Sequence, residues 1–110
     1  MTWRDYEELQ KEICAKYGAD WLATPPDKVI GLASKLEHTP VYGIRYVSGW
    51  MIWSGEYSEA DDFYQPTCAV HLVDYFPNAI NYLGLSEGWA FIIDSNGYED
   101  VWFDEKYLVE

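Results

Sequence analysis

The densest group of chemically capable side chains is acidic and lies in a polar segment that ends at Pro66. Its members are Glu56, Glu59, Asp61 and Asp62. Hard carboxylate oxygens at this density can hold Ca²⁺ or Mg²⁺, although their spacing matches no calcium-binding loop. The same carboxylates can form charge-assisted hydrogen bonds with Lys or Arg of a partner protein. A solvated charged loop is the third interpretation, and the residues alone leave all three open.

A second acidic group surrounds the end of the chain and contains Asp94, Glu99, Asp100, Asp104 and Glu105. Successive side chains of a strand point to opposite faces of the sheet, so Glu99 and Asp100 cannot both lie beneath it. A charge at a sheet edge also prevents unwanted strand pairing. The second group is therefore either a binding surface or a protected edge.

Aromatic residues bracket the acidic loop, with Trp53 and Tyr57 before it and Phe63 and Tyr64 after it. Rings supply desolvated anchors at protein interfaces, and neighbouring acids pair with a basic partner. The alternative is that Trp53 belongs to the core and the tyrosines cover it. We predict a partner-binding surface formed by Trp53, Glu56, Tyr57, Glu59, Asp61, Asp62, Tyr64, Asp94 and Asp100.

Motifs for catalysis, metals or cofactors are not evident in the chain. The closest approach to a nucleophile pair is Cys68 and His71, three residues apart on one predicted helix. An activated thiolate needs an electropositive environment, whereas this part of the chain is acidic. We therefore expect no catalytic residue, no metal site and no cofactor.

Charge is distributed unevenly along the 110 residues, which carry a net charge of −12. Residues 1–50 hold seven acids and six bases, hence −1, whereas residues 51–110 hold twelve acids and one base, hence −11. Such a field repels nucleic acid and anionic lipid and attracts cationic partners. Solubility alone is the simpler explanation of the same charge.

The spacing of apolar residues predicts a helix over residues 3–17, capped by Thr2 with Asp5 and ended by Gly18. Its inward face is expected to carry Trp3, Tyr6, Leu9, Ile13 and Tyr17.

Strands are predicted at 28–33, 41–47, 50–53, 89–93 and 98–103, with one more possible strand at 106–109. Residues 41–54 should form one hairpin, and Asn96-Gly97 predicts the turn of a second. A helix is expected from Thr67 to about Phe76, with Val70, Val73, Tyr75 and Phe76 facing inward, and a shorter one from Pro77 to Leu83. Residues 55–66 are expected to form an exposed loop.

These elements predict a single α+β domain over residues 1–110, with a mostly antiparallel sheet of about five strands. The N-terminal helix and one or two short helices in the middle complete it. The first ten residues carry four charges and no apolar stretch, so a signal peptide is not expected. No apolar run approaches the length that spans a bilayer, and we expect a cytoplasmic protein.

Several segments in the same order resemble a bacterial family, number thirty-three among the immunity proteins of polymorphic toxins and earlier known only as a domain of unknown function. The central likeness is Gly49-Trp50-Met51-Ile52-Trp53-Ser54-Gly55-Glu56, followed by Asp61-Asp62. Further segments are Ser34-Lys35, Tyr42-Gly43-Ile44-Arg45, Gly88-Trp89-Ala90-Phe91 and Glu99-Asp100-Val101-Trp102. The likeness spans about residues 29–103 and leaves the N-terminal helix outside.

The resemblance implies a non-enzymatic protein that protects its cell by binding a toxin, and it supplies no binding or catalytic residue. Because nuclease toxins hold phosphates in basic clefts, an acidic inhibitor can occupy such a cleft. Two other functions remain open. One is a small metal-dependent or acid–base enzyme that uses the loop 56–62 with Asp94 or Asp100, and the other is a regulatory or oligomerising domain.

Overall fold

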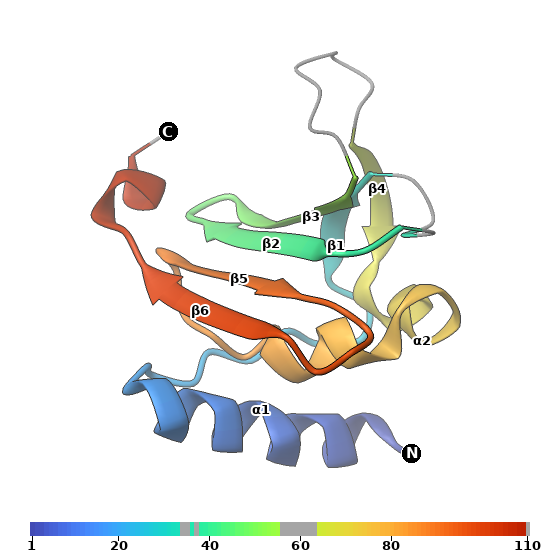
Figure 1. The fold of residues 1–110 in the computed structure, drawn as a ribbon, viewed down its shortest axis with the longest axis horizontal. Coiled ribbons are helices and arrows are strands. Elements are labelled where there is room, and N and C mark those ends of the chain that lie inside the picture. Colours follow the sequence, from blue (N-terminus) through green and yellow to red (C-terminus); the bar gives the residue numbers. More distant parts are fainter. Residues whose placement is uncertain (34–35, 37, 56–63, 110) are drawn as a thin grey trace.

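Six strands form one sheet in the order β4-β1-β3-β2-β5-β6 in the computed structural model, which describes residues 1–33, 36, 38–55 and 64–109 (Figure 1). The strands are β1 (Val29–Leu32), β2 (Val41–Tyr46), β3 (Gly49–Ser54), β4 (Gln65–Cys68), β5 (Trp89–Ile93) and β6 (Glu99–Phe103). Among these strands β1 and β3 run parallel, and the other neighbours pair antiparallel. The predicted α+β class with a mostly antiparallel sheet is confirmed.

Both predicted hairpins are present. Strands β2 and β3 pair from Val41 with Ser54 to Tyr46 with Gly49. Strands β5 and β6 pair along their whole length, and the turn between them contains the predicted Asn96-Gly97. The two hairpins meet where β2 pairs with β5, so they form a continuous four-stranded surface.

The N-terminal helix α1 (Trp3–Tyr17) begins and ends as the sequence predicts. Thr2 and Asp5 form a reciprocal capping box, and Gly18 adopts a left-handed conformation at the C-terminal cap. The buried face of α1 consists of Tyr6, Gln10 and Cys14, flanked by partly buried Trp3, Ile13 and Tyr17. Gln10 is completely buried, although its polarity placed it outside the expected inward face.

The three helices between β4 and β5 are short. A 3₁₀ turn η1 (Ala69–His71) precedes α2 (Leu72–Tyr75), and η2 (Pro77–Tyr82) follows. The helix predicted from Thr67 is wrong at its start, because Gln65–Cys68 forms the edge strand β4 instead. Three of the expected inward residues are also wrong, because Val70, Val73 and Tyr75 are exposed, whereas Ala69 and Leu72 are buried. The fourth, Phe76, is partly buried and packs against the core as expected.

The tail ends in a 3₁₀ turn η3 (Glu105–Leu108), and the strand considered for residues 106–109 is therefore not formed. Asp104 caps this turn by accepting a hydrogen bond from the Lys106 amide at 3.0 Å. Among the described residues, no helix has the length and apolar character needed to cross a membrane.

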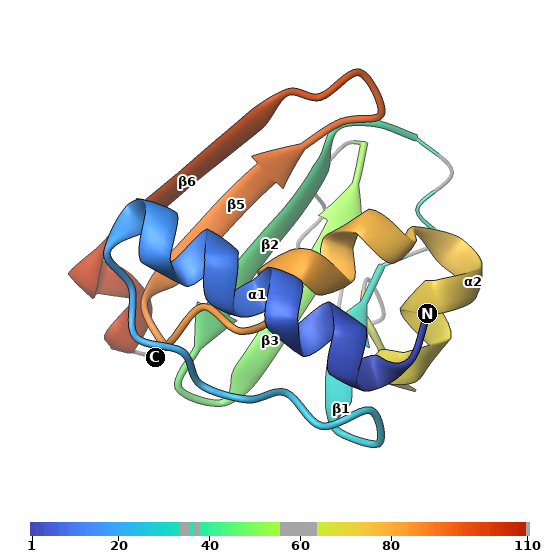
Figure 2. The same cartoon turned by 90° about the horizontal axis from the view of Figure 1, so that it is seen from below.

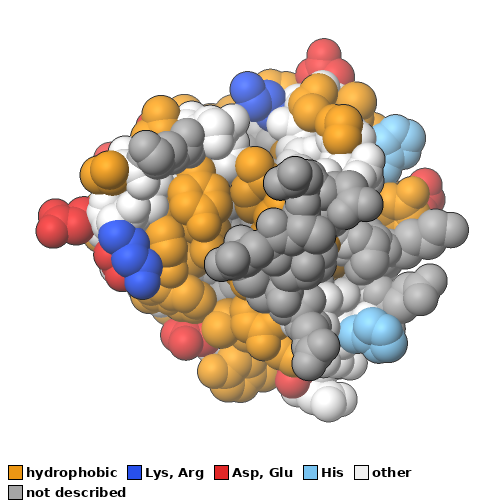
Figure 3. Space-filling model, turned by 90° about the horizontal axis from the view of Figure 1, so that it is seen from above, with side chains coloured by type: hydrophobic (Ala, Val, Ile, Leu, Met, Phe, Trp, Pro, Cys, Tyr) orange, Lys and Arg blue, Asp and Glu red, His pale blue; other side chains and the backbone are white. Residues whose placement is uncertain are grey.

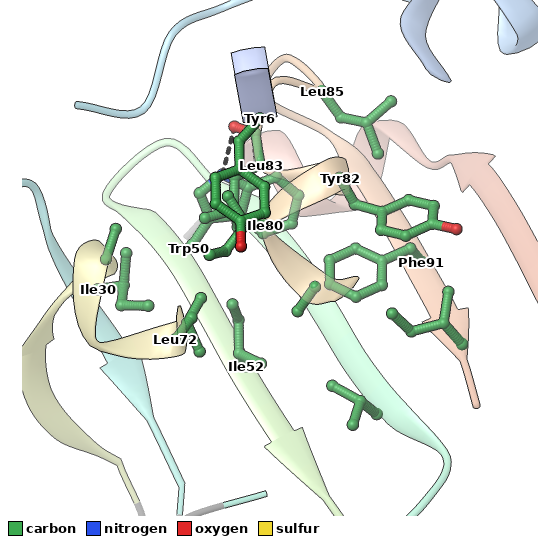
Figure 4. Close-up of a cluster of buried hydrophobic side chains, with 14 of the residues drawn as sticks. Tyr6, Ile30, Trp50, Ile52, Leu72, Ile80, Tyr82, Leu83, Leu85 and Phe91 are labelled. Carbon is green, nitrogen blue, oxygen red and sulfur yellow. Dashed lines mark hydrogen bonds between the residues drawn. The ribbon is translucent and has the colours of Figure 1, made fainter. Parts of the chain in front are cut away.

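Helices α1, α2 and η2 gather on one face of the sheet. In Figures 1 and 2, α1 crosses beneath the sheet, and η2 lies between α1 and the strands. The core fills the space between these layers with Trp50, Ile52 and Phe91 from the sheet and with Leu72, Ile80 and Leu83 from the helical side (Figure 4). The opposite face of the sheet receives none of these helices.

Candidate protein-binding face

The sheet surface opposite α1 carries large side chains in rows across four strands. The backbone register places Trp53, Tyr42, Ile92 and Asp100 side by side, one from each of β3, β2, β5 and β6. The next row consists of Met51, Ile44, Ala90 and Trp102. These two rows, together with Tyr46 at the end of β2, are called the sheet face below.

Ring stacking orders the side chains of the sheet face. The Tyr42 and Trp53 rings are stacked, with centroids 5.0 Å apart and planes 8° from parallel. Tyr64 meets Trp53 edge-on at 6.4 Å, which brings together two of the predicted binding residues. At the other end, Tyr46 meets Tyr107 of η3 edge-on at 5.8 Å. The rings are therefore held in place by contacts with each other.

The larger side chains of the sheet face are half-buried, and Asp100 is exposed. Figure 3 looks onto this side of the molecule and shows hydrophobic side chains gathered over the sheet. Large aromatic residues that are fixed by packing yet partly accessible are typical of protein-binding surfaces. The tyrosine and tryptophan rings also offer polar atoms for hydrogen bonds at such a surface.

Two glycines allow the strands beneath this surface to pack closely. A Cβ atom at Gly43 would lie 2.2 Å from Cε2 of Phe91, so the Phe91 ring packs directly on the β2 backbone from the core side. On the sheet face, a Cβ atom at Gly31 would lie 2.4 Å from Sδ of Met51. Both glycines therefore leave room for a large neighbouring side chain.

A buried arginine fixes β2 from below. Nη1 of Arg45 donates to the carbonyls of Leu22, Leu83 and Leu85 at 2.7, 3.1 and 2.9 Å. Its Nη2 donates to the Ala23 carbonyl at 3.3 Å. Burial lowers the pKa of Arg45 from its ordinary value, but carbonyl oxygens solvate the guanidinium. Arg45 therefore ties the loop before β1 and the segment after η2 to the strand that carries Tyr42 and Ile44.

The acids of the second half of the chain lie at different places. Asp100 lies on the sheet face, whereas Glu99 points to the helical side, so these neighbours occupy opposite faces as predicted. Asp94 stabilises the hairpin turn, where its Oδ1 accepts from the amides of Asn96 and Tyr98 at 2.8 and 2.9 Å. Asp94 is thus separated from the sheet face, although the sequence grouped it with Trp53 and Asp100.

Glu99 is the best-connected carboxylate among the described residues. Its Oε2 accepts from Lys16 Nζ and from the Tyr17 hydroxyl, and its Oε1 accepts from the Tyr82 hydroxyl, each at 2.5 Å. Burial acts to raise the pKa of Glu99, but these three donors outweigh burial and hold the pKa below its ordinary value. This network joins α1 and η2 to β6 and is a structural contact outside the sheet face.

Five of the predicted binding residues, Glu56, Tyr57, Glu59, Asp61 and Asp62, lie outside the described residues. Within the described part, Trp53, Tyr64 and Asp100 share one side of the sheet. Sequence reasoning missed Tyr42, Ile44, Ile92 and Trp102. The alternation of large residues at 42, 44 and 46 indicates a strand, and the same period places these three residues on one face.

Metal chemistry finds no support among the described residues, where no three His, Cys, Asp or Glu side chains converge in a way that could hold an ion. The two cysteines are free: Cys14 is buried, and its thiol lies 3.4 Å from the Gly84 carbonyl. Burial raises the pKa of the Cys14 thiol, which keeps it protonated and unreactive.

Comparison with known proteins gives one match. Residues 9–104 match the Imm33-like domain, a longer stretch than the segment from 29 to 103 over which the motifs suggest the likeness. No curated protein and no solved structure matches the chain significantly. The matched region includes most of α1 and all six strands, and therefore the whole sheet face. The chain belongs to the Imm33-like domain family, the immunity-protein family that its motifs resemble.

Proposed function

We propose that this protein is a cytoplasmic immunity protein that binds a cognate bacterial toxin through the sheet face and thereby neutralises it. Family membership supports the general function. The observation that carries the choice of surface is the pair of aromatic and aliphatic rows on the side of the sheet away from α1, α2 and η2.

The chemistry of the sheet face suits a protein partner. A few large aromatic residues near the centre of an interface commonly supply most of its binding free energy. Trp53, Tyr42 and Trp102 are residues of this kind, and the stacking of Tyr42 on Trp53 reduces the entropy lost when a partner fixes these two rings.

The charge of the chain favours a basic toxin. A net charge of −12 attracts a cationic surface over a distance comparable with the Debye length. Asp100 extends this charge to the edge of the sheet face itself. Toxins that cut nucleic acids are one class with a basic surface, because they hold phosphates.

The direct test is co-expression with the effector module of a candidate toxin from the same genome. Cells should survive only when the protein is present, and the two purified proteins should form a stoichiometric complex. Asp100→Lys should slow their association at low salt and weaken its salt dependence, because the mutation places a repulsive charge at the interface edge. A toxin module that kills the cells despite the protein, and forms no complex with it, contradicts the proposal.

A further inference from the structure

Strand β6 forms an open edge of the sheet. The strand order places β6 at one margin and β4 at the other, and within the described part of the chain β6 pairs with β5 alone (Figure 2). Its register with β5 is regular from Glu99 to Phe103, so no bulge interrupts this edge. An edge strand presents backbone N–H and C=O groups that another strand can pair with.

The outward backbone groups of β6 belong to alternate residues. The Asp94 amide donates to the Tyr98 carbonyl at 3.3 Å, and the Asp104 amide donates to the Gly88 carbonyl at 3.0 Å. Hydrogen-bonded pairs alternate with non-bonded pairs in an antiparallel ladder, and the residues of a non-bonded pair turn their N–H and C=O groups away from each other. The β6 residues that direct these groups to the open edge are therefore Glu99, Val101 and Phe103.

The opposite edge of the sheet offers fewer such groups. Strand β4 has four residues, and the Ala69 amide directly after it donates to the Lys28 carbonyl at 2.9 Å. By the same alternation, Pro66 and Cys68 are the outward-facing residues of β4. Proline has no N–H, so Cys68 alone keeps an outward donor in β4. Of the two edges, β6 therefore offers the longer regular series of donors and acceptors.

Charge distinguishes between the strands that could pair with β6. Asp100 is exposed on β6, and Asp104 and Glu105 follow the strand, whereas Lys106 is the single base of residues 51–110. A second copy of the chain would bring another net charge of −12 to this edge, which opposes self-pairing. A basic strand is attracted instead, and cross-strand pairs of opposite charge stabilise a sheet.

Trp102 adds an apolar contact two residues from Asp100. Both side chains lie on the sheet face, where Trp102 is half-buried. A strand paired with β6 would place alternate side chains beside these two residues. The matching strand has arginine or lysine opposite Asp100 and an aromatic or aliphatic residue opposite Trp102, two positions apart.

We propose that a basic strand of the toxin adds to the sheet at β6, antiparallel to it. Main-chain hydrogen bonds to Glu99, Val101 and Phe103 supply affinity, and contacts with Asp100 and Trp102 supply selectivity. This inference rests on the proposed function, since it places the toxin at the border of the sheet face. It adds the type of contact, strand addition, and the sequence pattern of the toxin segment that makes the contact.

Nuclear magnetic resonance of the ¹⁵N-labelled full chain tests the edge with acetyl-Thr-Tyr-Val-Arg-Thr-amide as the probe. In antiparallel pairing, the valine of the peptide lies opposite Val101, its arginine opposite Asp100 and its tyrosine opposite Trp102. The backbone amide signals of Val101 and Phe103 should shift and saturate in the millimolar range expected of so short a peptide.

Methylated peptides distinguish strand pairing from contact by side chains alone. N-methylation of the peptide's valine removes a donor that faces β6, and it should weaken binding at least about tenfold. N-methylation of its arginine is the matched control, because that N–H points away from β6, and binding should change by less than about threefold. Equal binding of the two methylated peptides would overturn the proposal.

Two variants at one position test the edge against the effector module identified by co-expression. Phe103→Pro removes an outward N–H, whereas Phe103→Ala keeps it, and both variants lose the same ring. Phe103→Pro should bind the effector module about tenfold more weakly than Phe103→Ala, because a partner carbonyl loses its donor. The methylated peptides need no substitution in the protein, so they decide the question even where proline lowers the melting temperature.

The outcomes separate this inference from the proposed function. Equal toxin affinity of the two variants, while the wild type forms the complex, overturns strand addition and leaves the proposed function standing. A toxin that does not bind the wild type overturns both. Sedimentation of the chain alone should show a monomer. A dimer that Phe103→Pro dissociates and Phe103→Ala does not would assign the edge to a second copy, and it would equally overturn the proposal.

Discussion

Glu99 shows how much of the structure depends on single polar residues. Its carboxylate receives donors from α1 and η2 while belonging to β6, so it links three elements that are distant in sequence. We expect Glu99→Gln to destabilise the protein by about 1–2 kcal/mol at neutral pH, because charge-assisted bonds are replaced by neutral ones. Urea unfolding followed by tryptophan fluorescence measures this loss.

The pH dependence of the same variant distinguishes charge from packing. Because the pKa of Glu99 is lowered in the folded state, its contribution to stability is complete above the ordinary Glu value, about 4.3, and declines as the pH falls through the folded value. The free energies of unfolding of the wild type and Glu99→Gln should therefore converge in acid. Tyr82→Phe, which keeps the carboxylate but removes one donor, should fall between them. A constant difference across the acidic range contradicts this account.

Arg45 is the second residue on which the fold depends. A lysine at this position cannot reach the carbonyls of Leu22, Leu83 and Leu85 at once, because it has one ammonium group in place of a planar fork. We expect Arg45→Lys to cost about 2–4 kcal/mol in the free energy of unfolding, since buried acceptors lose their donors. Exposed Lys11→Arg on α1 is the control and should change it by less than about 0.5 kcal/mol. Chemical denaturation that gave the two variants equal stability would exclude this role.

At the scale of elements, the packing of β2 on β5 depends on the absence of a side chain at Gly43. The Phe91 ring fills that space and is itself enclosed by Tyr82 and Trp50, with centroids 5.0 and 5.6 Å away. Gly43→Ala should therefore destabilise the protein by about 1–3 kcal/mol through overpacking. In a Phe91→Leu background the same mutation should cost clearly less, and a double-mutant cycle from thermal unfolding measures that coupling. Fully additive effects would show that the ring is not the obstacle.

Elements with a regular hydrophobic period were predictable from the sequence. The capping box, the apolar period of α1 and the Asn96-Gly97 turn are local signals. Each depends on residues that are close in the sequence, so the helix and the hairpin could be predicted without knowing the tertiary contacts. Strand β4 was missed because Pro66 and its polar neighbours lack a strand pattern, and an edge strand tolerates proline where a central strand does not. The inward side of Ala69–Tyr75 was also missed, because tertiary contacts bury Ala69 and Leu72 and leave Val70 and Val73 exposed.

For the candidate protein-binding face, the sequence indicated the types of residue but not how the strands arrange them. The proximity of Trp53 and Tyr64 was anticipated from their positions around the acidic loop. The rows that join Tyr42 to Ile92 and Asp100 depend on the pairing of β2 with β5, which no local signal specifies. The burial of Arg45 could not be predicted from the sequence either, because its carbonyl partners come from segments 22 to 40 residues away.

At the scale of the whole molecule, α1, α2 and η2 occupy one side of the sheet and leave the aromatic rows on the other. Strand β6 offers a matched pair of residues for testing this division: Trp102 lies on the sheet face, and its neighbour Phe103 points to the helical side, against Trp89. Mutation of either ring to alanine removes a large partly exposed side chain from the same edge strand. Differences between the variants therefore report on the face and not on the strand.

The most direct measurement is isothermal titration of these two variants with the purified effector module of the toxin that the protein neutralises in the co-expression test. Trp102→Ala should weaken binding by about 2 kcal/mol, roughly thirtyfold, as expected of an aromatic anchor. Phe103→Ala should bind within about threefold of the wild type, because its ring lies outside the interface. Wild-type affinity for Trp102→Ala together with a large loss for Phe103→Ala would contradict the assignment of the sheet face.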